Sequence, residues 1–100
     1  MLCVMVTCKD KAEAKHIGEL LLEKKLVACV NVFPVSSMFL WKGKVERNEE
    51  YMISCKTVSE KLAEVQKEIK KSHSYDLPVI SAWEEKTSVD VEKWIRGELS

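Results

Sequence analysis

The nine residues SHSYDLPVI, from Ser72 to Ile80, hold the side chains with the clearest chemical potential in this 100-residue chain. They include one of only two histidines, together with Tyr75 and Asp76. The imidazole of His73 can bind a metal ion or transfer protons, because histidine is the side chain that changes charge nearest neutral pH. The same segment can instead be a rigid joint, in which His73 bonds free carbonyls at a helix end and Tyr75 anchors its ring and hydroxyl. Both interpretations stay open.

Lys56 is the strongest candidate for a functional charge elsewhere in the chain. It ends a strand that reads as buried, and a buried ammonium group needs a partner. Glu49, Glu50 or Asp76 would supply that partner, within one chain or across a contact between chains. Lys56 then belongs either to a polar pocket with Tyr75 or to a plain structural ion pair.

Trp41 is the third candidate, two residues before Gly43 and three before Lys44. It lines a cleft between subunits or, alternatively, is an aromatic side chain buried in a contact between chains.

The four cysteines, at positions 3, 8, 29 and 55, form no CxxC pair and no cluster with histidine at zinc-site spacing. All four fall in apolar, strand-like runs, where a free cysteine behaves as a small hydrophobe. We expect reduced thiols in the core or in an interface. The alternative is that Cys8, Cys29 and Cys55 serve as soft ligands for copper(I).

Apolar periodicity gives the order of the elements that must position these residues. Strands are predicted over residues 2–8, 26–33, 35–41, 51–57 and 79–83, with Pro34 breaking the second run. Amphipathic helices are predicted to end near residues 25 and 71, and a short last helix before Gly97. The expected N-terminal caps are Asp10 with Glu13, Thr57 with Glu60, and Ser88.

A hairpin turn must follow Trp41, and two positions for it are possible. We favour Arg47-Asn48 over Lys42-Gly43, because it pairs WKGKVE with NEEYMI and leaves Gly43 as a bulge. Either way the hairpin is long for so small a domain. We therefore expect part of this ribbon to project and to pair with another chain.

The element order predicts one domain covering residues 1–100, with an α+β fold. It is a ferredoxin-like βαββαβ plait with an antiparallel sheet, a long hairpin between its second and third strands, and an extra C-terminal helix. This plait occurs in enzymes, metal chaperones, RNA binders and regulatory trimers, so the fold alone does not give the function.

Three functions of this plait are disfavoured by particular residues. RNA recognition needs exposed aromatics on the two central strands, where only Tyr51 is aromatic. A metal chaperone needs a second thiolate three residues after Cys8, where Lys11 stands. The segment TCKDK also lacks the glycines and the arginine of an acylphosphatase phosphate loop.

Sixteen basic and sixteen acidic residues give a formal net charge of zero, without any block of five like charges. The broad positive field that holds a nucleic-acid backbone is therefore missing. No stretch reaches the roughly 18 apolar residues of a membrane span, and the first residues do not have the pattern of a signal peptide. We expect a soluble, cytoplasmic protein that binds neither nucleic acid nor membranes.

Two stretches together resemble the CutA family of divalent-cation tolerance proteins. SSMFLWKGKVERNEEYMISCKT, residues 36–57, is similar to a signature of that family, and HSYDLP, residues 73–78, is similar to its His-Pro-Tyr-acidic-x-Pro segment. VTCKDKAEA and KKLVACVNV also fit, so the resemblance covers nearly the whole chain. It implies a homotrimer, similar in outline to PII-type signalling proteins, with a role in copper and divalent-metal tolerance and no established enzymatic reaction.

The resemblance also implies metal ligands, namely a cysteine on the first strand, a histidine at the end of the second helix and an acidic residue after the proline. The matching positions here are Val6, Ser72 and Val79, and none of these side chains is a competent ligand. Ser74 also replaces the family's usual proline. His73, one residue after the expected ligand position, is the remaining metal candidate.

We therefore expect a CutA-like homotrimer that acts in the response to copper or another divalent cation, or as a small regulatory module. Its candidate cleft between subunits contains six residues: Trp41, Glu50, Lys56, His73, Tyr75 and Asp76. No bound ion is expected to be essential for folding, and no catalytic motif stands out. The alternative is a small enzyme or anion-binding protein, with His73 as acid or base and Lys56 binding an anionic group.

Overall fold

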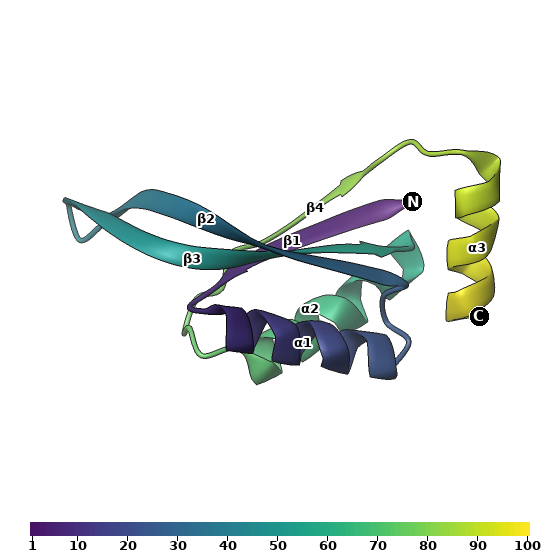
Figure 1. Cartoon of the computed structure of the whole chain (residues 1–100), viewed down its shortest axis with the longest axis horizontal. Coiled ribbons are helices and arrows are strands. Elements are labelled where there is room, and N and C mark those ends of the chain that lie inside the picture. The colour runs from purple at the N-terminus through teal and green to yellow at the C-terminus, as the bar shows by residue number, and fades with distance from the viewer.

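The structure is a computed structural model that describes all residues from 1 to 100. The elements, labelled in Figure 1, are β1 (Leu2–Cys8), α1 (Lys11–Glu23), β2 (Cys29–Trp41), β3 (Lys44–Thr57), α2 (Leu62–Ser72), β4 (Ile80–Glu84) and α3 (Val89–Leu99). A short 3-10 helix, Ser59–Lys61, precedes α2. The predicted βαββαβ order with an extra C-terminal helix is confirmed. None of the helices has both the length and the apolar character needed to cross a lipid bilayer.

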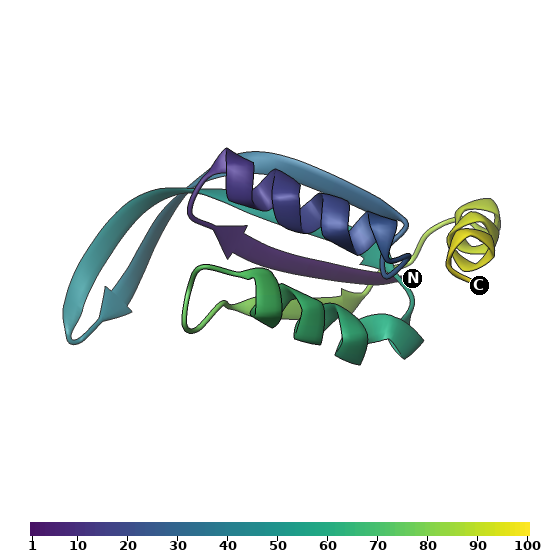
Figure 2. The same ribbon diagram turned by 90° about the horizontal axis from the view of Figure 1, so that it is seen from below.

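All four strands form one antiparallel sheet in the order β2-β3-β1-β4. The central strand β1 pairs with β3 on one side and with β4 on the other. Helices α1 and α2 lie side by side over one face of the sheet (Figure 1, Figure 2), while α3 lies beyond the sheet, near the start of β1. This arrangement is the ferredoxin-like plait that the sequence predicts.

The core lies between the sheet and the two helices. Residues four apart share one face of a helix, and Ile17 with Leu21 on α1 and Val65 with Ile69 on α2 are fully buried. They belong to a cluster of 13 buried side chains that includes most of β1. A second, smaller cluster holds α3 in place through Val58, Ile95 and Leu99.

The four cysteines are all free thiols, as predicted. Cys3, Cys8 and Cys55 are buried, and Cys29 is half-buried. Burial raises the pKa of the Cys55 thiol to about 12, which keeps it protonated and unreactive at neutral pH.

The hairpin turn is at Lys42-Gly43, so the favoured position at Arg47-Asn48 is wrong. Trp41 pairs with Lys44 directly across the turn, and Arg47 lies within β3, opposite Met38. Lys42 and Gly43 both have positive φ, 51° and 80°, which is the backbone of the two-residue turn that matches strand twist. Gly43 adopts this conformation without strain, so it is a turn residue and does not form a bulge.

Several element boundaries also differ from the prediction. Pro34 does not break β2, because β2 is an edge strand, where a residue without an N–H group is tolerated. Helix α3 continues through Gly97 to Leu99, and β4 starts at Ile80, one residue later than expected.

Two of the three predicted caps form. Asp10 accepts a hydrogen bond from the Glu13 amide at 2.8 Å, and Ser88 accepts one from the Val91 amide at 3.3 Å. The box of Thr57 with Glu60 does not form. Thr57 is fully buried at the end of β3, and its hydroxyl donates to the Leu26 carbonyl at 2.7 Å instead.

The hairpin of β2 and β3 projects beyond the helices, and the molecule measures 45 × 24 × 21 Å along its principal axes. Figure 2 shows the free end of this ribbon far from α1 and α2. It carries large exposed apolar side chains, with 75% of Leu40 and 53% of Trp41 accessible to solvent. The predicted long, projecting ribbon is therefore present, although its turn lies elsewhere.

Close packing of α1 on β2 predicts opposite effects for the same substitution at two helical glycines. A Cβ at Gly18 would lie 2.9 Å from Val30 Cγ1, whereas one at Gly97 has no neighbour within 4 Å. Alanine gains about 1 kcal/mol of helix propensity at either site. At Gly18 the overlap costs about 1–3 kcal/mol, so we expect Gly18→Ala to lower the free energy of unfolding and Gly97→Ala to raise it.

Urea unfolding of the two variants at one protein concentration measures both changes. Stabilisation by Gly18→Ala as large as that by Gly97→Ala would contradict the close contact with Val30.

Candidate functional site

His73 is the C-cap residue of α2, and its side chain is fully buried. Its Nδ1 accepts a hydrogen bond from the Tyr75 amide at 3.0 Å. Because Nδ1 accepts, Nε2 carries the hydrogen and donates it to the Thr7 carbonyl at 2.8 Å. The imidazole is thus neutral and joins the end of α2 to the end of β1. It bonds a carbonyl, as the joint interpretation predicts, but that carbonyl belongs to β1.

Tyr75 follows this joint and turns its hydroxyl toward β3. The hydroxyl donates to Glu50 Oε2 at 2.7 Å, and the Tyr75 ring lies against His73 with 4.8 Å between ring centroids. Burial, followed by the hydrogen bond to the Glu50 carboxylate, raises the pKa of Tyr75 well above its ordinary value. Glu50 is only 6% exposed, so Tyr75 is the donor that makes its burial tolerable.

A groove of about 700 Å³ separates the ribbon from this joint. Trp41, Glu50 and Tyr75 all line it, together with the exposed apolar side chains of Leu40, Leu77 and Val79. Three of the six predicted site residues therefore share one groove, apolar along most of its length, with a Tyr–Glu pair in its wall.

Lys56 is placed elsewhere, at the opposite end of β1. It pairs in the sheet with Cys3, whereas His73 bonds Thr7, four residues along the same strand, which is roughly 13 Å away. Within one chain Lys56 and His73 therefore do not form a common site. A substrate site across a chain boundary also needs an accessible imidazole, and the side chain of His73 is fully buried.

Within one chain the partner of Lys56 is Glu85, and none of the expected partners Glu49, Glu50 and Asp76 contacts it. Lys56 Nζ donates to Glu85 Oε2 at 2.7 Å, and this hydrogen bond raises the pKa of Lys56. Glu49 instead accepts from the Ser36 hydroxyl at 2.8 Å. Asp76 is exposed and takes part in none of the hydrogen bonds of the site.

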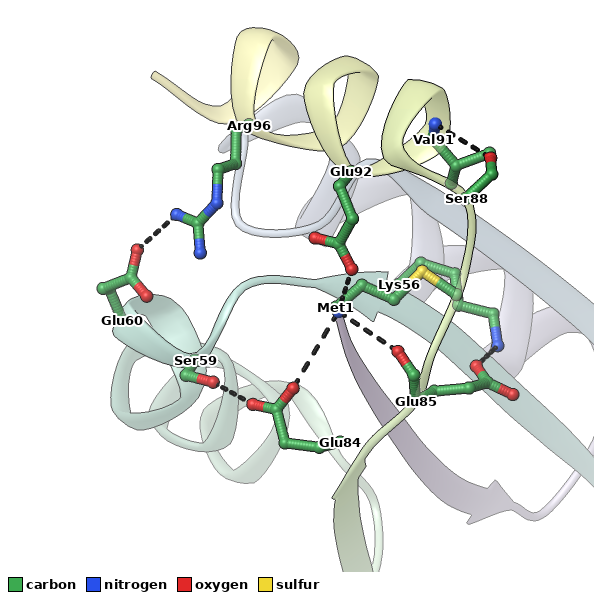
Figure 3. Close-up of polar contacts among 10 residues, drawn as sticks. All are labelled: Met1, Lys56, Ser59, Glu60, Glu84, Glu85, Ser88, Val91, Glu92 and Arg96. Carbon is green, nitrogen blue, oxygen red and sulfur yellow. Dashed lines mark hydrogen bonds and ion pairs between the residues drawn. The ribbon is translucent and has the colours of Figure 1, made fainter.

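Glu85 belongs to a polar cluster that holds α3 to the sheet (Figure 3). The Met1 ammonium contacts the side chains of Glu84 and Glu92 and donates to the Glu85 carbonyl. Ser59 donates to Glu84, and Arg96 pairs with Glu60 at 2.9 Å. Lys56 thus reads as part of a structural network around α3, away from the groove.

A second polar cluster joins the opposite end of β1 to both helices. The sequence named His73 and, as an alternative copper(I) ligand, Cys8, but it indicated Glu13 only as part of a helix cap. One ligand-type atom each from Cys8, Glu13 and His73 lies within 4.8 Å of the others. Glu13 accepts from the Lys9 amide through Oε1 and from the Ser74 amide through Oε2, each at 3.0 Å. Spacing along the chain cannot reveal this cluster, because positions 8, 13 and 73 meet only once α2 docks beside β1.

The pKa values of two groups in this cluster shift in opposite directions. Burial tends to raise the pKa of Glu13, but hydrogen bonds from Ser74 and Lys9 outweigh it and lower the pKa. Burial, with the nearby carboxylate of Glu13, raises the pKa of the Cys8 thiol to about 12. In the structure the carboxylate is therefore charged and the thiol is protonated.

The positions that the resemblance assigns to metal ligands cannot bind a cation. Val6 is buried among apolar side chains, and Val79 is 68% exposed and apolar. The Ser72 hydroxyl is bonded to Glu68 at 3.4 Å. The sulfur, oxygen and nitrogen donors of Cys8, Glu13 and His73 form the ligand set that fits a divalent cation.

Fold and surface together define a class: a ferredoxin-like plait with a long, apolar, projecting ribbon. The sequence model of the CutA1 divalent ion tolerance protein family matches residues 2–98. The chain therefore belongs to the CutA family, as its motifs predict.

Two curated relatives carry the name divalent-cation tolerance protein CutA. The Archaeoglobus fulgidus protein is 49% identical over 79 residues, which are 79% of this chain and 78% of the relative. The Thermotoga maritima protein is 35% identical over 97 residues, 96% of each chain. A solved structure described as a periplasmic divalent cation tolerance protein CutA from Archaeoglobus fulgidus superposes with a TM-score of 0.96, at 42% identity and full coverage of both chains.

The Tyr75–Glu50 contact predicts a measurable loss of stability when its donor is removed. Tyr75→Phe leaves the buried Glu50 carboxylate without a partner, which costs about 1–3 kcal/mol of unfolding free energy. A double-mutant cycle that combines Tyr75→Phe with Glu50→Gln separates the free energy of the contact from the effect of losing the hydroxyl alone. Tyr51→Phe, at a tyrosine whose hydroxyl makes no side-chain hydrogen bond, is the matched control. Equal losses at Tyr51 and Tyr75 would contradict the interpretation.

Proposed function

We propose that the protein acts in divalent-cation tolerance as a homotrimer, and that the chains meet through the projecting ribbon and its groove. The observation that carries this proposal is the exposed apolar surface of the ribbon. Membership of the CutA family supports the cation role. The resemblance of the motifs supports an assembly of three chains.

The ribbon surface is too apolar to stay in water. Met38, Leu40 and Val45 on the ribbon are each more than half exposed, and Leu77 and Val79 extend the same surface across the groove. Contiguous apolar patches on a folded chain mark sites of association, whereas scattered single residues do not. Burying this patch against another chain removes it from water.

The sheet also offers a route to association through its backbone. β2 and β4 are both edge strands, each with one side unpaired within the chain. A contact between two different surfaces, such as the ribbon of one chain and the groove or β4 edge of the next, repeats head to tail. Closure of that contact after three copies gives a ring without free edges.

The cation is the second part of the proposal. We propose copper or another divalent ion as the physiological signal, in the cytoplasm, with the trimer as a PII-like regulatory module. The ion is not needed for folding, because the core is an apolar cluster of 13 side chains with free thiols. We assign the chain no catalytic step, since both nitrogens of His73 and the ammonium of Lys56 are already bonded.

Light scattering coupled to size exclusion tests the assembly. We expect three times the chain mass of 11.5 kDa. Leu40→Asp with Trp41→Asp should shift the protein to a monomer, because two charges in a buried apolar contact are strongly unfavourable. Leu22→Asp, at an exposed apolar residue on α1, should leave the mass unchanged. A monomeric wild-type protein at micromolar concentration contradicts the proposal.

Growth in copper tests the cation role separately. Expression of the chain in a bacterium that lacks its own CutA protein should restore growth at inhibitory copper(II) concentrations. The Leu40→Asp, Trp41→Asp variant should restore it less, and Leu22→Asp should match the wild type. No effect of the wild-type chain on growth in copper, zinc or cobalt would refute a role in cation tolerance.

A further inference from the structure

Three elements bring electron-pair donors together at one end of the core. Cys8 is the last residue of β1, Glu13 lies in the first turn of α1 and His73 caps α2. Cys8 and the His73 side chain are fully buried, and the Glu13 side chain is 9% exposed. The ligand-type atoms of all three lie within 4.8 Å of one another.

The His73 ring is held in the orientation of a metal ligand. Histidines that bind metals usually donate their second ring N–H to a carbonyl or carboxylate, which fixes the ring and its tautomer. Here Nε2–H donates to the Thr7 carbonyl at 2.8 Å. The one lone pair that a cation can take is therefore on Nδ1, where it now accepts the Tyr75 amide at 3.0 Å.

A carboxylate oxygen of Glu13 lies near the same nitrogen. Nδ1 of His73 and Oε1 of Glu13 are 4.0 Å apart, and no proton lies between two such acceptors when the ring is neutral. Oxygen and nitrogen ligands of one tetrahedral zinc ion lie roughly 3.3–3.5 Å apart. A side-chain movement of well under 1 Å therefore brings these two atoms to the spacing of a shared cation, with the Cys8 sulfur as the third ligand.

We propose that Cys8, Glu13 and His73 form a binding site for one borderline divalent cation of the zinc type. Sulfur and imidazole ligands favour such an ion over calcium or magnesium, which prefer oxygen alone. A fourth position is left for water or another small ligand.

Charge balance makes this buried site feasible. The cation displaces the proton of the Cys8 thiol to solvent, so that a thiolate and a carboxylate together neutralise the two positive charges. The imidazole contributes a neutral lone pair, and the loaded site carries no net charge. A buried charge without such compensation is highly unfavourable. No electron transfer is involved.

The site also connects to the groove. Nδ1 now accepts the Tyr75 amide, and a cation bound there takes that lone pair. Binding therefore releases Tyr75, whose hydroxyl holds Glu50 in the wall of the groove. The inference rests on the proposed cation role for its biological meaning, although the binding itself is measured on the isolated protein.

Cobalt(II) and zinc(II) chloride are the probes. Cobalt bound to a thiolate gives a sulfur-to-metal absorption band in the near ultraviolet, so one equivalent per chain should produce this band in the wild-type protein. Zinc should then remove the band by competition. Titrations are read after prolonged incubation, since the buried ligands open slowly to an entering ion.

Matched variants locate the site. Cys8→Ser should abolish the band, and both Cys8→Ser and His73→Gln should weaken zinc at least about tenfold by competition or calorimetry. Cys29→Ser and His16→Gln, at a half-buried cysteine and an exposed histidine, should leave the band and the affinity unchanged. Circular dichroism establishes that each variant is folded. If His73→Gln fails to fold, the band of the wild type and its loss in Cys8→Ser decide the question.

The absence of a band in the wild type, or its persistence in Cys8→Ser, overturns the site. Loss of the band in Cys29→Ser overturns it as well. These results are independent of the proposed function: a trimer that restores growth in copper but gives no cobalt band refutes this site alone. A monomer that binds one zinc through Cys8 refutes the assembly and leaves the site standing.

Discussion

The placement of β1 in the middle of the sheet is the constraint from which both polar clusters follow. Its antiparallel pairing with β3 and β4 fixes which residues of three strands meet at each end. At one end Cys3 lies beside Lys56, which bonds Glu85 and so joins the network around α3. At the other end Thr7 holds the His73 ring. A strand shifted by one residue would turn its buried side chains to the other face and dismantle both clusters.

The core of the single chain is small, and the ribbon lies outside it. Only about 21 of 100 residues are buried in the single chain, and a chain of this length has little apolar surface to spare for its own stability. Yet the hairpin of β2 and β3 projects beyond the helices, and its large apolar side chains, among them Met38 and Leu40, stay exposed. Contiguous apolar surface of this kind marks a site of association, and it is the physical basis of the proposed trimer.

The fold and its family were predictable from the sequence because both depend on local periodicity and on motif order. Buried β1, the caps at Asp10 and Ser88, and the long ribbon all followed from residue spacing. Trp41, Glu50 and Tyr75 were chosen as candidates, and they line one groove.

The failure at the hairpin turn has a local cause, whereas the others come from interactions between residues far apart in the sequence. The turn at Arg47-Asn48 was favoured because it lengthens both arms of the hairpin. The turn forms at Lys42-Gly43, where Gly43 accepts a positive φ without strain. Thr57 bonds Leu26, 31 positions away, in place of capping the helix beside it. Lys56 pairs with Glu85 because β4 lies against β1, a neighbour that becomes visible only once the strand order is known. The cluster of Cys8, Glu13 and His73 draws one residue each from the end of β1, from α1 and from the end of α2. It therefore forms only when both helices are packed on the sheet.

The segment from Ser72 to Val79 is therefore both a structural joint and part of the candidate site. Its backbone amides at Ser74 and Tyr75 bond the carboxylate of Glu13 and the ring of His73, on the buried side. The side chains of Tyr75, Leu77 and Val79 form one wall of the groove, on the exposed side. A ligand that takes the Nδ1 lone pair of His73 must release the Tyr75 amide. The groove wall is thus connected to the buried cluster through the hydrogen bond between the Tyr75 amide and the His73 ring.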